Sequence, residues 1–395
     1  MSSWTVDGFR CAGVHCGIKK NGKPDLGIIV AEAPVACAGV FTTNIVVAPP
    51  VVLSRTHLAH QDRAQAVVIN SGNANACTGE QGMLDAIEMA ELAAQITGCE
   101  RTDVQVCSTG VIGAPLPMER IRQGLREATS RLSKSGLPDF ADAICTTDTF
   151  RKMRSHPVNI GERTIQIAGV SKGAGMIHPN MATMLGVVLT DAPIEPSDLT
   201  KIWRRICAAT FNAISVDGDT STNDTALILA SGRAGNAPLG GDELTAFEAA
   251  LYDLTKELAL DIVRDAEGGT KVVTITIEGA RSHDEARQVA ETIALSPLVK
   301  TALHGEDPNW GRIVAAAGRS GVQFDPENIR LSIGDATIYE DGRWLGPQAE
   351  TNAHEVMKRA EYALTIDLRL GTASHSIFTC DLSEQYIRIN ADYRS

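Results

Sequence analysis

Apolar residues recur along this chain with two spacings, one typical of strands and one typical of helices. Residues 66–70 and 104–107 are short, largely apolar stretches, as expected for buried strands. Residues 80–97 instead carry apolar side chains at every third or fourth position, and Gly98 is a natural helix stop. The first half of the chain therefore predicts strands that alternate with helices.

The second half continues this alternation and then restarts it. The pattern predicts a hairpin over 156–160 and 164–170, a strand after Met184, a helix capped near Ser197, a strand over 225–230, a long helix over 242–265 and a strand over 271–278. Beyond Gly279 come a helix, a hairpin over 330–339, a further helix and paired strands. We therefore expect a mixed α/β (α+β) protein whose sheets are covered by helices, with a smaller C-terminal α/β subdomain over 280–395.

Composition and charge narrow the class of protein. The chain has 395 residues, of which 44% are hydrophobic and 21% charged, as in soluble globular proteins. Its net charge of −12 argues against nucleic acid or an anionic membrane as a partner. The N-terminus does not resemble a secretory signal, and no apolar run approaches the roughly 20 residues that span a bilayer. Nine scattered cysteines without CxxC pairs indicate reduced thiols, so we expect a cytoplasmic protein without a zinc site.

The candidate chemistry gathers in the string SKGAGMIHPNMATML, residues 171–185. Thr183 follows the small Ala182 and precedes an apolar run, at the end of a loop that contains Gly173 and Gly175. A threonine at the mouth of a strand is ordinarily a structural residue. If the bond between Ala182 and Thr183 is cut, however, Thr183 gains a free α-amine. That amine has a pKa of about 7.7–8.0 and can activate the neighbouring hydroxyl as a nucleophile.

The string KGAGMIHPNMATML resembles the processing and active-site segment of the ornithine acetyltransferase family, the bifunctional glutamate N-acetyltransferases of arginine biosynthesis. DGDTSTNDT (217–225) and HGEDPNWGR (304–312) are also similar to segments of this family. The resemblance implies a precursor that cuts itself between Ala182 and Thr183. It also implies a layered α/β/β/α sandwich of the ornithine acetyltransferase/D-aminopeptidase type, a layering that the hydrophobic pattern alone does not select.

The same resemblance implies a division of the chain. Residues 1–182 would form the α chain after self-cleavage and most of the N-terminal sandwich. Residues 183–279 would form the first part of the β chain, beginning with the nucleophile strand, and 280–395 the C-terminal subdomain. The two chains of the precursor are expected to assemble as α2β2.

Several site residues follow from the resemblance rather than from spacing. An acyl transfer needs hydrogen-bond donors for the developing oxyanion, and the resemblance assigns this role to the Thr109 hydroxyl and the Gly110 amide. Spacing alone would favour a strand-ending turn there, a solvated lysine at 172 and a surface carboxylate at 267. The resemblance assigns substrate binding to a set that includes the C-terminal residue, which is often threonine in relatives and is serine here: Thr146, Lys172, Thr183, Glu267, Asn390 and Ser395.

The expected reaction transfers acetyl from N2-acetylornithine to Thr183, releases ornithine and passes the acetyl to glutamate. Because both half-reactions use one site, the kinetics should be ping-pong. This is the activity of a glutamate N-acetyltransferase. No motif reports whether acetyl-CoA is also a donor, which would add amino-acid N-acetyltransferase activity. The chemistry requires no cofactor and no metal.

Two other classes of function stay open on the sequence. One is an N-terminal-nucleophile aminopeptidase or amidohydrolase of related fold, in which water takes the acyl group. The other is a non-catalytic ligand-binding protein that keeps the loop as scaffold. A metal loop at 217–225 is disfavoured because the segment lacks the order and closing glutamate of an EF-hand. His178, beside Pro179, is expected to be structural, since an N-terminal amine removes the need for a catalytic histidine.

Overall fold

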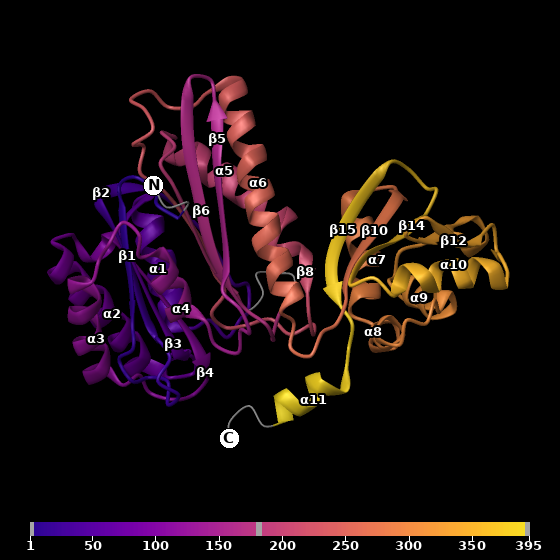
Figure 1. Ribbon diagram of the computed structural model, residues 1–395, viewed down its shortest axis with the longest axis horizontal. Helices are drawn as coiled ribbons and strands as arrows, with labels where there is room; N and C mark the ends of the chain where they lie inside the picture. Colours follow the sequence, from indigo (N-terminus) through magenta and orange to yellow (C-terminus); the bar gives the residue numbers. More distant parts are fainter. Residues whose placement is uncertain (1–3, 179–183, 392–395) are drawn as a thin grey trace. The chain divides into compact units, whose positions relative to one another are not determined.

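The computed structural model describes residues 4–178 and 184–391, which form two compact units (Figure 1). Unit 1 comprises Met1–Asn212 and Asp219–Ile262, and unit 2 comprises Ala213–Gly218 and Val263–Ser395. Thr183 and Ser395, together with the Ala182 side of the expected cleavage site, lie outside the described residues.

Unit 1 is built on an eight-stranded mixed sheet. Along the main path the order is β4-β3-β2-β9-β7-β6-β5, and β1 pairs with β2 beside this path. The pairs β3–β4 and β7–β9 are parallel and the others antiparallel. The strands are β1 Phe9–Val14, β2 Leu26–Phe41, β3 Arg63–Asn73, β4 Val104–Val111, β5 Lys152–Ile160, β6 Arg163–Lys172, β7 Leu185–Thr190 and β9 Thr225–Ala230.

The helices of unit 1 pack against this sheet. They are α1 Pro49–His60, α2 Gly79–Thr97, α3 Met118–Ser130, α4 Leu137–Ile144, α5 Pro196–Ala209 and α6 Gly241–Arg264, with the short 3₁₀ turns Arg101–Asp103 and Phe211–Ala213. At its end, α6 crosses into unit 2. The edge strand β4 is covered by α1, because the Ser54 hydroxyl exchanges hydrogen bonds of 2.8 Å with both the amide and the carbonyl of Val106.

The long strand β2 joins two layers of the sheet. Its register shifts between Val30 and Val35, a bulge that bends the strand. The first part of β2 belongs with β1, β3 and β4, and its last part pairs with β9, followed by β7, β6 and β5. One hydrophobic cluster contains residues from both parts, including Ile69 of β3 and Val187 of β7. The two layers therefore face each other across a shared core.

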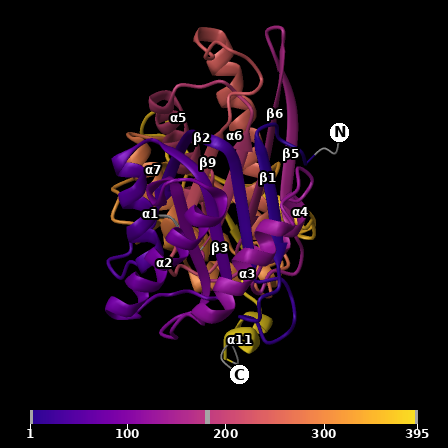
Figure 2. The ribbon, with the colours of Figure 1, turned by 90° about the vertical axis from the view of Figure 1, so that its left-hand side faces the viewer.

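Side chains alternate between the two faces of each strand, and those that point away from the shared core pack against helices. Ile28 and Val68 point away from the shared core and pack with α2 and α3, which lie on this face (Figure 2). On the other layer, Gly169 of β6 leaves room for Leu254 and Leu258 of α6. The Nε1 of Trp203 on α5 donates to the Ala226 carbonyl at 3.0 Å. The order helix, sheet, sheet, helix confirms the expected α/β/β/α layering.

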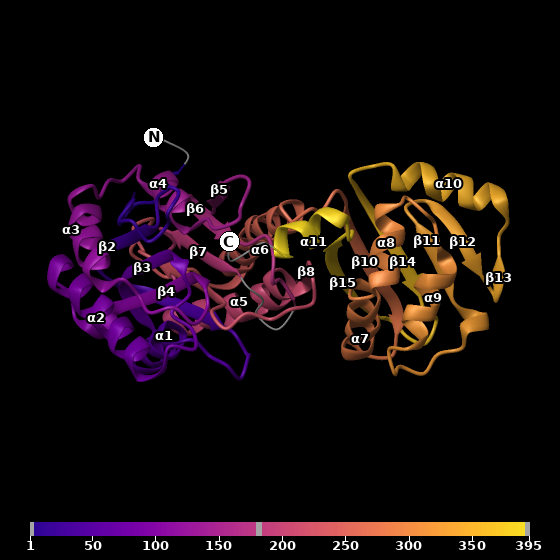
Figure 3. The same cartoon turned by 90° about the horizontal axis from the view of Figure 1, so that it is seen from below.

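Unit 2 contains a seven-stranded sheet in the order β13-β12-β11-β14-β10-β15-β8, which Figure 3 shows from β15 to β13. The strands are β8 Ile214–Ser215, β10 Val272–Ala280, β11 Arg330–Ile333, β12 Ala336–Glu340, β13 Arg343–Trp344, β14 Glu361–Asp367 and β15 Ala373–Cys380. The helices are α7 His283–Ala294, α8 Pro297–His304, α9 Trp310–Gly318, α10 Pro347–Met357 and α11 Glu384–Ala391, with a 3₁₀ turn over Pro326–Asn328. A single hydrophobic cluster joins the sheet with α7, α9 and α10.

Most expected elements are confirmed, with differences at their ends. The strand expected over 225–230 is β9 with the same bounds, and the helix expected over 242–265 is α6. The cap expected near Ser197 is wrong: Glu195 is the N-cap, without a side-chain cap bond. Pro196 begins the helix because its missing N–H costs nothing there. The division at 182 and 279 stays a prediction. Among the described residues, no helix is both long and apolar enough to cross a membrane.

Candidate active site

Lys172 and Thr109 are hydrogen-bonded inside unit 1. Lys172 ends β6 and Thr109 lies on β4, and the Lys172 Nζ donates to the Thr109 Oγ1 at 2.9 Å. Both side chains are buried. Because the hydroxyl already accepts from an ammonium group, its own proton remains to be donated, and no described residue accepts it. This geometry supplies a polarised hydroxyl donor beside a buried cation.

Asp148 holds the segments around Lys172 together. Its Oδ2 accepts from the Thr146 amide at 2.7 Å, and its Oδ1 accepts from the Gly173 amide at 2.9 Å. The Lys152 Nζ donates to the same Oδ1 at 2.5 Å. Burial by itself would raise the pKa of this carboxyl, but the ammonium groups of Lys152 and Lys172 and the Gly173 amide lower it to about 2. Asp148 therefore stays ionised and fixes the loop that follows β6.

The pKa of Lys172 is lowered by burial, and the nearby carboxylate of Asp148 opposes this shift. The neighbouring Cys145 thiol has its pKa raised to about 11, by burial and then by Asp148. Lys19, whose Nζ donates to the carbonyl of Cys145 at 2.5 Å, has its pKa lowered to about 8 by burial. The site is thus a compact group of buried charges in which the thiol is not an activated nucleophile.

Gly110 stands where the backbone of β4 comes very close to β3. Its φ is +131°, a conformation that side chains rarely adopt, and an added Cβ would lie 2.3 Å from the carbonyl carbon of Gly72. Gly110 also follows Thr109 directly in the sequence, so the Gly110 amide belongs to the residue next to the one that carries the polarised hydroxyl. Only glycine fits this position, which explains the STG sequence at the end of the strand.

Asp224 anchors the start of β7 through a buried carboxyl group. Its Oδ1 accepts from the Met184 amide at 2.9 Å, and its backbone carbonyl accepts from the Thr42 amide at 2.9 Å. The Oδ2 atom is buried and has no hydrogen-bond partner within the described part of the chain. Burial raises the pKa of Asp224 well above its ordinary value. The carboxyl therefore holds the amide of Met184, the residue that follows Thr183 in the sequence, and its second oxygen is unsatisfied among the described residues.

In unit 2, two of the expected substrate residues contact each other. Glu267 is buried, and its Oε2 accepts from the Nδ2 of Asn390 on α11 at 2.9 Å. The Ser383 hydroxyl donates to the Gly268 carbonyl at 2.6 Å and fixes the turn after Glu267. Glu267 is thus not the surface carboxylate that its sequence context suggests.

The structure groups the predicted site residues into two sets. Thr109, Gly110, Thr146 and Lys172 come together in unit 1, and Glu267 and Asn390 in unit 2. Asp148 and Asp224 also belong to the site of unit 1, and the sequence patterns did not predict them. Asp148 lies in the TTDT run and Asp224 in the TSTND run, and both are acidic residues among small polar ones, the only signal the sequence offered. Across residues 4–178 and 184–391, no three His, Cys, Asp or Glu side chains are arranged to hold a metal ion.

Known proteins resemble this chain over nearly its whole length. The profile of the ArgJ family matches residues 10–395. The arginine biosynthesis bifunctional protein ArgJ of Geobacter sulfurreducens is 47% identical over 392 residues, which cover 99% of this chain and 100% of that protein. The protein of the same name from Symbiobacterium thermophilum is also 47% identical, with coverage of 98% and 97%.

A crystal structure of the arginine biosynthesis bifunctional protein ArgJ from Bacillus halodurans has a TM-score of 0.49 and 39% identity, covering 51% of this chain and 95% of that one. Ornithine acetyltransferase of Mycobacterium tuberculosis, complexed with ornithine, has a TM-score of 0.41 and 36% identity, covering 45% and 96%. The family relationship rests on the sequence matches, which confirm the resemblance found in the loop string. The chain belongs to the ArgJ family.

Proposed function

We propose that this chain is an acetyltransferase that moves the acetyl group of N2-acetylornithine to glutamate through an acetyl ester on Thr183. The observation that carries this proposal is the buried hydrogen bond from Lys172 to Thr109. It leaves the Thr109 hydroxyl proton free to be donated to an oxyanion, next to the glycine-specific backbone at Gly110. Membership of the ArgJ family supports the choice of substrates.

The reaction requires self-cleavage first. The Thr183 hydroxyl attacks the carbonyl carbon of Ala182, the C–N bond to Thr183 breaks, and the acyl group moves to the hydroxyl oxygen as the α-amine becomes free. Water then hydrolyses this ester, leaving a carboxylate on Ala182 and both a hydroxyl and an amine on Thr183. Asp224 supports this step by holding the Met184 amide, which fixes the chain directly after the nucleophile.

Transfer then proceeds in two half-reactions. The Thr183 hydroxyl gives its proton to its own amine and attacks the acetyl carbonyl, and the oxyanion accepts from Thr109 and Gly110. The C–N bond of the donor breaks, the proton passes to the leaving amine and ornithine departs. The amine of glutamate attacks the ester in the same way, and N-acetylglutamate leaves with Thr183 regenerated.

Other properties are proposed on the family resemblance alone. Thr146, Lys172, Glu267, Asn390 and Ser395 would contact substrate, the α and β chains would assemble as α2β2, and the enzyme would work in the cytoplasm. Acetyl-CoA would be a second acetyl donor if the enzyme is bifunctional. No cofactor or metal enters the chemistry.

A substitution series at Thr109 tests the proposal. Thr109→Val keeps the shape of the buried side chain but removes the hydroxyl, and it should lower kcat for acetyl transfer by about 10²–10³-fold. Thr109→Ser should retain most of the activity. The kcat of each variant is measured from initial rates with N2-acetylornithine and glutamate. Each protein is first shown to be cleaved. Full activity of Thr109→Val, or release of free acetate at a rate that glutamate does not change, would contradict the proposal.

A further inference from the structure

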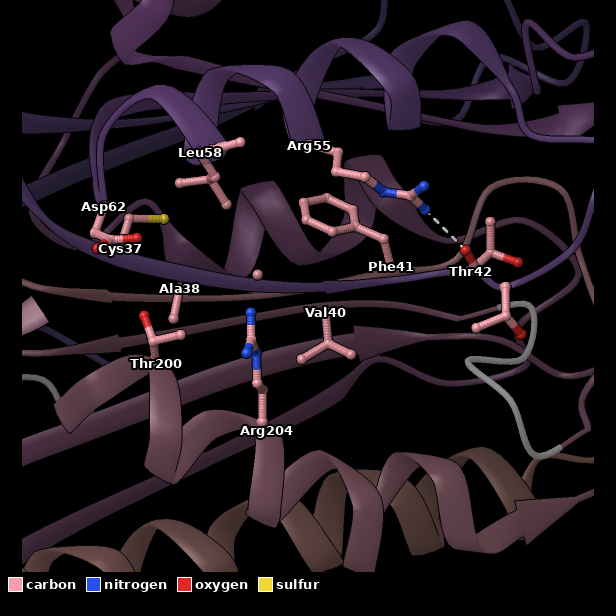
Figure 4. Close-up of a pocket in the computed structure, with 13 residues that line it drawn as sticks. Cys37, Ala38, Val40, Phe41, Thr42, Arg55, Leu58, Asp62, Thr200 and Arg204 are labelled. Atoms are coloured by element: carbon pink, nitrogen blue, oxygen red, sulfur yellow. Dashed lines mark hydrogen bonds between the residues drawn. The ribbon is translucent and has the colours of Figure 1, made fainter. Parts of the chain in front are cut away.

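A groove in unit 1, away from Lys172 and Thr109, exposes one edge of β2. It has a volume of about 520 Å³ and lies between α1 and α5. Figure 4 shows the strand crossing between the two helices, with Arg55 coming from one and Arg204 from the other. We call this the edge groove. Its lining residues are drawn in Figure 4, and they include Gly39, Phe41, Arg55, Leu58, Thr200 and Arg204.

The last part of β2 is paired on one side only. Residues 36–41 pair with β9, whereas pairing with β3 ends at Ala36. On the side of β2 that faces β9, the Thr42 amide donates to the Asp224 carbonyl. On the opposite side of β2, the Cys37 amide donates to the Asp62 carbonyl. Since successive residues of a strand point their backbone groups to alternate sides, those of Gly39 and Phe41 point to the same side as Cys37. No described residue pairs with them there, so their N–H and C=O groups face the groove.

The walls of the groove carry two arginines, one exposed aspartate and an unsatisfied hydroxyl. The aspartate, Asp62, lies at the Cys37 end, so the positive side chains outnumber the negative one. Arg204 is exposed and forms no ion pair or hydrogen bond with any described residue. The Thr200 Oγ1, one turn earlier on α5, is buried and has no partner among the described residues. On the α1 side, the Arg55 Nη2 donates to the Thr42 carbonyl at 2.9 Å, and its guanidinium lies 5.7 Å from the centre of the Phe41 ring.

We propose that the edge groove binds an extended acidic peptide segment of a partner protein, which adds to β2 as a further strand. Backbone hydrogen bonds to Gly39 and Phe41 would fix the segment, as in other cases of strand addition. Alternate side chains of an added strand point to opposite faces. On one face they would meet Thr200 and Arg204, which suit carboxylates, and on the other Leu58 and Phe41, which suit apolar groups.

A second copy of this chain is a poorer occupant. Two copies related by a twofold axis would pair the same segment of β2 with itself. That arrangement would bring Arg204 of each copy, which lies beside the middle of the segment, toward that of the other (Figure 4), and like charges across an interface are unfavourable. The open edge of β2 also lacks the residues that usually prevent edge-to-edge pairing of strands, because residues 37–41 contain no charged residue and no proline.

The test uses the whole protein and two fluorescent, end-blocked hexapeptides, one of alternating valine and glutamate and one of alternating valine and lysine. Fluorescence anisotropy should show binding of the glutamate peptide and at least tenfold weaker binding of the lysine peptide. Arg204→Glu should weaken binding of the glutamate peptide by about tenfold or more. Lys201→Glu, on the same helix but outside the groove, is the matched control and should leave binding unchanged.

Backbone pairing is tested by N-methylation. Methyl groups on the amides that face β2 should abolish binding, whereas methyl groups on the alternate, outward-facing amides should not. Absence of binding, equal binding of the lysine peptide, or equal binding of both methylated forms would overturn the proposal. It would also be overturned if Arg204→Glu split a larger assembly into smaller ones in sedimentation velocity, since a second copy would then cover the edge.

Discussion

Lys172 and Asp148 are ionisable side chains that lie inside unit 1, and each is stabilised by the other's charge. Burial opposes the charged form of both groups, yet the pKa of Asp148 is still held at about 2. Such groups are costly unless they remain paired and hydrogen-bonded. Their arrangement explains why small changes at these positions should alter both the stability of the fold and its chemistry.

Asp148→Asn should destabilise the fold, because it removes the buried carboxylate whose charge balances the ammonium groups of Lys152 and Lys172. We expect the free energy of unfolding at pH 7 to fall by about 3–5 kcal/mol, measured by urea unfolding. The matched control is Asp142→Asn, which breaks an exposed pair with Arg151 and should cost about 0–1 kcal/mol. Equal effects of the two substitutions would contradict this assignment.

The pH dependence of stability follows from the same carboxyl. The pKa of Asp148 is lower in the folded protein, about 2, than its ordinary value. Its stabilising contribution is therefore complete above the unfolded pKa of about 3.9. It is lost as the pH falls through about 2, so the difference between wild type and Asp148→Asn should shrink across this range.

Asp224 should behave in the opposite sense. Because burial raises its folded pKa, its contribution to stability is complete below about pH 3.9 and is lost as the pH rises through the folded value. Asp224→Asn keeps an acceptor for the Met184 amide but carries no charge. The variant should therefore gain stability relative to wild type as the pH rises, as measured by thermal unfolding at several pH values. A difference that does not change with pH would show that Asp224 is not a buried carboxyl.

At the scale of elements, the close approach of β3 and β4 creates the backbone of the site. Gly110→Ala would push a Cβ against Gly72 and also strain a positive φ. Gly113→Ala, in the same segment, has a φ of +83° and open space around its Cβ, so it isolates the cost of the φ alone. We expect Gly113→Ala to cost about 1–2 kcal/mol, and Gly110→Ala to cost clearly more and to lower acetyl transfer. Both are measured by urea unfolding and initial rates; equal costs would show that the close approach is unimportant.

The elements were largely predictable because their signals are local. The apolar spacing of 80–97 led directly to α2, and the run at 225–230 to β9. The layering was not predictable from the pattern, since it depends on the bulge in β2 and on which faces of distant strands share a core. Asp148 and Asp224 were missed for a related reason. Their importance comes from burial and from partners far along the chain, which no local pattern reports.

At the scale of the whole molecule, the cysteines report on the integrity of both units. All nine thiols are free, and Cys77 is exposed, whereas Cys11, Cys107 and Cys207 of unit 1 and Cys380 of unit 2 are buried. Burial raises the pKa of Cys11 and Cys107 to about 12. In the native protein a thiol reagent should therefore modify Cys77 rapidly and the buried thiols only on unfolding. Cys77→Ser should remove the rapid phase, and persistence of that phase would contradict the described burial.

The central claim is that Thr183 becomes an N-terminal nucleophile that carries the acetyl group. The most direct test is a denaturing mass spectrum of the purified wild-type protein, before and after brief exposure to N2-acetylornithine without glutamate. We expect two polypeptides, residues 1–182 and 183–395, of which only the second gains the mass of one acetyl group; glutamate should then remove it. A single intact chain that nevertheless transfers acetyl, or an acetyl group on any residue other than Thr183, would contradict this mechanism.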